Sequence, residues 1–107
     1  MNELLQQCID VRRQFDNVPT LALGLKLSEE VGEFSETVLK ACGFLRHKEV
    51  KETPFGEAAD VINVVLGILG NLYPENTSQE IVLKLKEQID IKKNKYERIM
   101  REYGSNT

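Results

Sequence analysis

The chain has 107 residues and a net charge of −3, so its length predicts one domain spanning residues 1–107. The acidic balance disfavours a general surface for nucleic acid or anionic membranes. The N-terminus has no basic head followed by an apolar run, and the longest apolar run, Val64–Leu69, is too short to span a membrane. Cys8 and Cys42 are far apart and form no CxxC pair, which indicates free, buried thiols. We therefore expect a cytoplasmic protein with no membrane or nucleic-acid partner.

Hydrophobic periodicity predicts an all-α fold of four to five helices. The first helix covers Asn2–Phe15, and Pro19 ends the break that follows it. The second covers Thr20–Cys42, with Gly43 as its C-terminal cap. Its apolar residues recur at four- and three-residue steps, which predicts that they form the face toward the core. These residues are Leu27, Val31, Phe34 and Val38.

Two further helices follow a charged connector. Thr53 and Pro54 suit the N-cap and first position of a helix that runs to about Leu72. This third helix is apolar nearly all round, which is typical of a buried helix. Thr77 and Glu80 form a capping box for the fourth helix, the most basic part of the chain.

Four acidic residues recur at one-turn spacing on the second and third helices. Glu30 and Glu33 lie one turn apart, and Glu57 and Asp60 repeat this spacing. Buried carboxylates are costly unless positive charge meets them, and Lys26 and Lys40 are the only basic residues between positions 20 and 45. Hard oxygen donors in this number suit Mg²⁺, or Mn²⁺ as an alternative.

Other interpretations of these residues stay open. Acidic residues on a helix usually form a solvated face, and Glu29 and Glu36 fit that interpretation as well as a functional one. Asn63, one turn beyond Asp60, can bond a sugar or base edge, or can satisfy a buried backbone group. A di-iron bundle would use Glu-x-x-His on two helices, and the sequence contains no such motif.

The order Glu29-Glu30-x-x-Glu33, then Glu57-x-x-Asp60, resembles the EExxE…ExxD signature of the MazG-like all-α nucleoside triphosphate pyrophosphohydrolases. The flanking residues Lys26-Leu27-Ser28 and Ala59-Asp60-Val61-Ile62 are similar too. The resemblance spans roughly Leu21–Asn71 and includes the terminal helices only loosely.

The resemblance implies a helical bundle completed by oligomerisation, with an active site shared between subunits of a homodimer or homotetramer. It implies hydrolysis of a (deoxy)nucleoside triphosphate between the α and β phosphates, giving monophosphate and pyrophosphate. Glu30, Glu33, Glu57 and Asp60 match the family's magnesium ligands. Glu29, or one of the ligands such as Glu30 or Glu33, would activate water.

The resemblance also suggests contacts to the substrate. In the last helix, Lys92 to Tyr96 is similar to the family's basic segment ahead of a tyrosine, so Lys92, Lys95 and Tyr96 are candidates. Phe15 corresponds to the family's aromatic residue near the end of helix one. Lys26 and Asn63, close to the acidic residues in sequence, complete the candidate contacts.

Two other classes of function remain. One is a related all-α phosphohydrolase acting on dUTP, dUDP or phosphoribosyl-ATP. The other is a non-catalytic helical bundle that binds metal or a partner helix. In each case the apolar third helix predicts that part of the Val61–Leu72 surface is buried by a second subunit, with the second and third helices of two chains in one bundle.

Overall fold

The computed structural model describes residues 2–15, 17–45, 47, 49 and 52–104. Over these residues the fold is all-α, without strands, and has four helices: α1 (Asn2–Phe15), α2 (Thr20–Ala41), α3 (Pro54–Leu72) and α4 (Ser78–Gly104). The helical boundaries predicted for α1, α2 and α3 are confirmed to within one residue.

The helix ends follow the capping residues in the sequence. Thr53 Oγ1 accepts a hydrogen bond from the backbone N–H of Gly56 at 3.1 Å. Thr77 and Glu80 form the reciprocal bonds of a capping box, at 2.9 and 3.1 Å. Gly43, just after α2, has φ 91°, a left-handed conformation that glycine adopts without steric cost.

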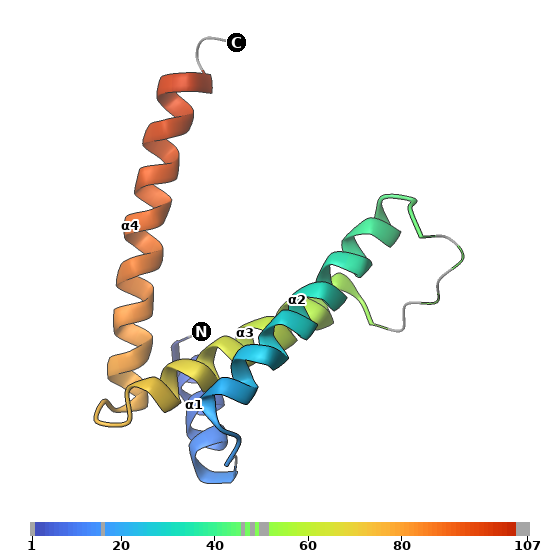
Figure 1. The fold of residues 1–107 in the computed structure, drawn as a ribbon. Coiled ribbons are helices and arrows are strands. Elements are labelled where there is room, and N and C mark those ends of the chain that lie inside the picture. The colour runs from blue at the N-terminus through green and yellow to red at the C-terminus, as the bar shows by residue number, and fades with distance from the viewer. Residues whose placement is uncertain (1, 16, 46, 48, 50–51, 105–107) are drawn as a thin grey trace.

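The four helices form a V rather than a closed bundle. Figure 1 shows α2 and α3 as a hairpin on one side, α4 projecting on the other, and α1 at the base. The Cα radius of gyration is 16.9 Å, against about 13 Å for a compact chain of this size. Over the described residues α2 packs against α3, and α2 and α4 do not touch. A single chain therefore leaves much helical surface uncovered.

The hydrophobic core is small and lies at the base of the V. Ile9 of α1, Leu66 of α3, and Ile81 and Val82 of α4 form one buried cluster. Glycine in α3 permits this close packing. A Cβ at Gly67 would lie 2.8 Å from Cδ of Arg12, so the arginine side chain crosses α3 where no side chain is in its way.

Much apolar surface lies outside this core. Among the described residues, 21 large hydrophobic side chains are exposed and six hydrophobic residues are buried. Exposed apolar surface on this scale is uncommon on monomers. The single chain leaves part of α3 uncovered, since Phe55 is 89% and Ile62 51% exposed; burial of the Val61–Leu72 surface by a second subunit stays a prediction.

The prediction of which residues of α2 face the core is wrong in part. Val31 and Val38 are exposed, whereas Leu23, Glu30 and Thr37 are the buried residues of α2. The reason is that α2 packs on one neighbour only, α3, so a single narrow strip of the helix is covered. Cys42, expected to be buried, is exposed, and Cys8 is half-buried.

In the described part of the chain, α3 alone is long and apolar enough to span a membrane, with a mean hydropathy of 1.3. Core helices of soluble proteins meet the same criterion, so this is weak support for a membrane span. Glu57 and Asp60 lie within α3, and carboxylates are rare inside membrane helices. The sequence-based expectation of no membrane partner stays a prediction.

Arg13 binds the C-terminal end of α3. Its guanidinium donates to the carbonyl oxygens of Gly70 at 3.1 Å, Tyr73 at 3.0 Å and Asn76 at 2.7 Å. The carbonyls of Gly70 and Tyr73 carry the partial negative charge of the helix end, which a cation stabilises, and Asn76 lies in the turn that follows. Arg13 thereby fastens α1 to α3 and to the turn that leads into α4.

Replacing Arg13 with alanine should lower the free energy of unfolding by about 1–3 kcal/mol, because bonds from a charged donor to the helix end are lost. The measurement is urea unfolding followed by circular dichroism. Gln14→Ala, at the next exposed position of α1, serves as the control and should change stability less. Equal effects of the two substitutions would contradict the role given to Arg13.

Candidate functional site

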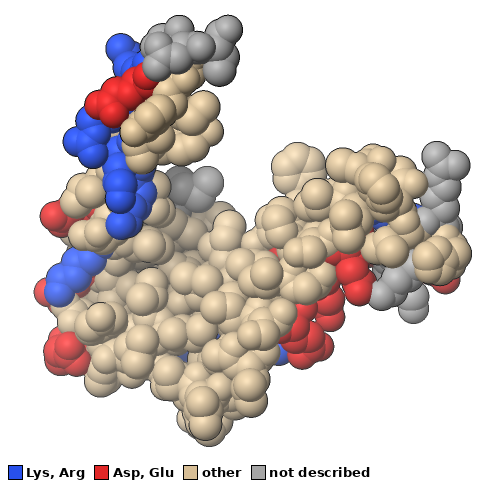
Figure 2. All heavy atoms as spheres, turned by 45° about the horizontal axis from the view of Figure 1, so that its top comes forward, with Lys and Arg blue, Asp and Glu red and all other residues tan. Residues whose placement is uncertain are grey.

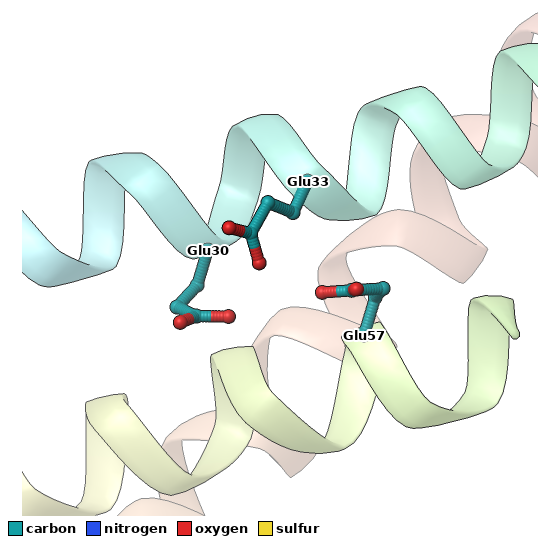
Figure 3. Close-up of side chains that lie close together, drawn as sticks. All are labelled: Glu30, Glu33 and Glu57. Carbon is teal, nitrogen blue, oxygen red and sulfur yellow. The ribbon is translucent and has the colours of Figure 1, made fainter. Parts of the chain in front are cut away.

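Three glutamates converge between α2 and α3. Figure 3 shows Glu30 and Glu33 of α2 and Glu57 of α3 pointing into the same space between the two helices. One carboxylate oxygen from each lies within 4.8 Å of the others. Because residues three apart share a helix face, the spacing of Glu30 and Glu33 brings both toward α3, where Glu57 meets them one turn after the helix start.

These carboxylates are largely withdrawn from water. Glu30 and Glu57 are each only 6% exposed, and Glu33 is half-buried. Oε2 of Glu30 and Oε2 of Glu57 are buried without a hydrogen-bond partner in the described part of the chain. Buried polar atoms of folded proteins nearly always have partners, so these two oxygens suit a ligand that the polypeptide does not supply.

Lys26 contacts the acidic cluster. Its Nζ lies 3.1 Å from Oε1 of Glu30 and 3.7 Å from Oε2 of Glu29. The hydrogen bond to Glu30, followed by the charge of Glu29, raises the pKa of Lys26, so the lysine stays protonated. One lysine shared between two carboxylates leaves Glu33 and Glu57 without an equivalent partner among the ion pairs described.

The shortage of positive charge appears in the pKa values of the other two acids. Burial, and then the negative charges of Glu30 and Glu29, raise the pKa of Glu33. Burial, and then the charges of Glu33 and Asp60, raise the pKa of Glu57. Like charges held together in this way favour either a bound proton or a bound cation.

The residues present fit a divalent metal ion. Mg²⁺ takes oxygen ligands at about 2.1 Å, in part from carboxylates and in part from water and substrate phosphates. Glu30, Glu33 and Glu57 offer carboxylate oxygens with two buried acceptors unused. Mn²⁺ suits the same ligands.

Asp60 does not join the three glutamates. It is exposed, and it lines a neighbouring pocket of about 470 Å³ together with Glu30 and Lys26. Its charge still contributes to the raised pKa of Glu57. Asp60 is thus placed where it faces a ligand entering this pocket, one turn from the buried carboxylates.

Arg12 was not singled out from the sequence and is the main addition to the site. Its side chain crosses α3 at Gly67 and lines two pockets, the one with Asp60 and a second of about 600 Å³. Asn63 also lines both. The signal in the sequence was indirect: Gly67 interrupts the apolar α3 where an arginine of another helix must pass.

Of the other residues predicted to contact substrate, some lie beside the acidic cluster and the rest lie on α4. Phe15 is 73% exposed and lines the second pocket, so it lies beside the site. Asn63 donates from Nδ2 to the carbonyl oxygen of Ala59 at 3.1 Å, which favours the interpretation as a backbone partner. Lys92 and Tyr96, like Lys95, lie on exposed α4, which does not contact α2 in the same chain.

Comparison of the chain with models of protein families, with curated proteins and with solved structures gives no match. The assignment of a function therefore depends on the geometry of the residues above.

With metal removed by a chelator, the chain should become less stable as the pH rises above 4.5, the ordinary value for a glutamate. The raised pKa of Glu57 means that the folded state holds a proton that the unfolded state has released, so the folded state is favoured at lower pH. Glu57→Gln should flatten this dependence, as measured by urea unfolding at about pH 5 and about pH 7.5. Glu87→Gln, at an exposed position of α4, should leave the slope unchanged. A slope in Glu57→Gln equal to that of the parent would mean that Glu57 is not buried as described.

Mg²⁺ or Mn²⁺ should raise the melting temperature, because a ligand that binds only the native state stabilises it, by about 2.7 kcal/mol at one hundred times Kd. Glu33→Gln and Glu57→Gln should each reduce this gain, as measured by thermal unfolding across a metal titration. Glu36→Gln, one turn further along α2, is the matched control. If all three variants respond like the parent, the three glutamates do not hold the metal.

Proposed function

We propose that this chain is a magnesium-dependent nucleoside triphosphate pyrophosphohydrolase of the MazG-like kind. It would cleave a (deoxy)nucleoside triphosphate between the α and β phosphates, releasing monophosphate and pyrophosphate in the cytoplasm. The observation that carries this proposal is the cluster of Glu30, Glu33 and Glu57, with two buried oxygens that have no partner. A purely structural core gains nothing from such a cluster, since apolar residues of similar size would be at least as stable.

Glu30, Glu33 and Glu57 would hold the metal, and Asp60 would complete the ligand set from the pocket side. When bound, the cation neutralises charge on the phosphate oxygens and polarises the attacking water. Metal chemistry of this type needs oxygen ligands in a partly enclosed site with room for phosphate and water. The pocket of about 470 Å³ beside Glu30 and Asp60 provides that room.

A carboxylate of α2 would accept the proton of the attacking water. Glu29 is exposed and lies outside the cluster of three glutamates, so it would stay uncoordinated when the metal is bound. One of the ligands, Glu30 or Glu33, is the alternative.

The two pockets suit the other parts of a nucleotide. Arg12 and Lys26 line the pocket next to the acids, where they would contact phosphate oxygens. Phe15 and Val11 line the adjoining pocket, whose apolar wall suits the flat face of a base. Asn63 lies where the two pockets meet, near the position that the sugar would occupy.

A homodimer or homotetramer forms part of the proposal. The small core and the 21 exposed hydrophobic side chains support association of subunits. A related phosphohydrolase for dUTP, dUDP or phosphoribosyl-ATP would use the same carboxylates, and rates across a panel of nucleotides, with product identification, distinguish these enzymes.

With a good substrate, pyrophosphate should appear only when Mg²⁺ or Mn²⁺ is present, as measured by ion chromatography of the products. Glu57→Gln should lower the rate by at least about 100-fold, since even residues that only support a metal ligand cost 10–100-fold when changed. Glu87→Gln is the control and should retain the parent rate. Release of orthophosphate alone, or activity that persists in chelator, would disprove cleavage between the α and β phosphates.

A further inference from the structure

The far half of α4 is exposed over its whole described length. Every residue from Lys86 to Gly104 is exposed, and Figure 1 shows this segment projecting from the base of the V. We call it the arm; its 19 residues extend about 28 Å. Most helical stability in proteins comes from packing of an apolar face, so an exposed helical arm gains stability from a surface to pack on.

The arm carries a narrow seam with a repeat of 3.5 residues. Its positions alternate by four and three residues, as in a coiled coil. They are Ile89, Lys92, Tyr96, Ile99 and Tyr103; Leu85, one step earlier, continues the spacing but packs against the core. A seam of two positions in every seven residues is wide enough to contact one other helix. A helix that lies on a membrane presents a wider apolar face. The arm also lacks Trp and Phe.

A second seam with identical spacing follows the outer side of α2. Its positions are Leu21, Leu25, Ser28, Gly32, Ser35 and Leu39, and all six are exposed. Leucines lie toward both ends, and small residues lie in the middle, where no atom comes within 4 Å of a Cβ built on Gly32. The middle of the seam on the arm carries the large side chains of Tyr96 and Ile99. A helix with bulky central residues packs closely against one with small central residues.

We infer that the arm of one copy docks antiparallel along the outer seam of α2 in a second copy. The two seams cannot meet within a chain, because α2 and α4 do not touch there. Both helices run outward from the base of the V (Figure 1). When two copies face each other with their bases at opposite ends, each arm points against the direction of the α2 of the other copy. Figure 2 shows a largely uncharged surface on both sides of the hollow between the arm and the hairpin.

Charge complementarity selects the register. Lys86 and Lys93 flank the seam of the arm seven residues apart, and Glu29 and Glu36 flank the seam of α2 seven residues apart. The antiparallel alignment that places Tyr96 opposite Ser28 brings both lysines beside the two glutamates. Lys93 then lies next to Glu29, and Lys86 next to Glu36. A parallel alignment can match the same seven-residue spacing, but it places the lysines and the glutamates on opposite sides of the seam.

Docking of two arms on each other is disfavoured by the same charges. Lys92 lies in the seam, and Lys86, Lys93 and Lys95 flank it, so two arms would bring like charges together. On the outer side of α2 the residues that flank the seam include Glu29 and Glu36, whereas the arm has six basic and four acidic residues. The hairpin of a second copy is thus the complementary surface.

Cysteine pairs test this register in a chain that carries Cys8→Ala and Cys42→Ser. The alignment places Ile99 opposite Leu25, so mixing an Ile99→Cys chain with a tagged Leu25→Cys chain should give a mixed disulfide under mild oxidation. Two control pairs should cross-link at least about tenfold less. In one pair the cysteine on α2 lies about 15 Å along the helix from Leu25. In the other pair the cysteine on the arm lies on the side away from α2. The two pairs are Ile99→Cys with Ser35→Cys, which reports parallel docking, and Arg98→Cys with Leu25→Cys.

The unmodified chain gives an independent measurement. A mixture of ¹⁴N- and ¹⁵N-labelled protein, treated with a zero-length carbodiimide reagent, should yield mixed-isotope links of Lys93 to Glu29 and Lys86 to Glu36. Sedimentation should show a dimer or larger. Four results would overturn the inference: a monomer, links between arms only, links between hairpins only, or a monomer bound to anionic vesicles. None of these readouts depends on catalysis, so they are separate from the test of pyrophosphate release.

Discussion

Glu30 and Glu57 face each other between α2 and α3, each 6% exposed and each with one buried oxygen unpartnered. Lys26 satisfies one oxygen of Glu30 and none of Glu57. The pairing of α2 with α3 therefore brings together charges that repel, and this pairing is the largest contact between helices in the chain. A bound divalent cation would turn the repulsion into attraction at the same place. On the proposed function, binding of metal and stability of the hairpin are consequently linked.

The rest of the fold depends on how closely α1 can approach α3. At Gly67 a side chain would meet Arg12, and at Gly70 it would lie 3.3 Å from Cγ2 of Ile9. With both positions empty, Arg12 crosses α3 to reach the pockets, and Arg13 reaches the carbonyls at the end of the helix. The two arginines, adjacent in sequence, thus differ in role: one lines the candidate site and the other holds the helices that form it.

Local signals in the sequence predicted the helix ends well. The cap at Thr53, the capping box at Thr77 and the left-handed Gly43 depend on residues within one turn of each other. The convergence of Glu30, Glu33 and Glu57 followed from their one-turn spacing and the absence of nearby cations. The exposed side of α2 could not be predicted in this way, because Val31 and Val38 have the periodicity of a core face whichever surface covers them. For the same reason the contribution of Arg12 required the packing of α1 across α3 to be known.

The V-shaped chain changes the interpretation of the basic last helix. The resemblance to known pyrophosphohydrolases suggested that Lys92, Lys95 and Tyr96 contact substrate, yet α4 does not touch α2 in the same chain. On the inferred register, Lys92 and Tyr96 lie in the seam against Gly32 and Ser28, on the side of α2 that is turned away from Glu30. The seam on α2 and the carboxylates that face α3 then use different sides of one helix. Ser28 and Gly32 lie on the outer side of α2, and Glu30 and Glu33 lie on the side that faces α3, so one helix serves both surfaces.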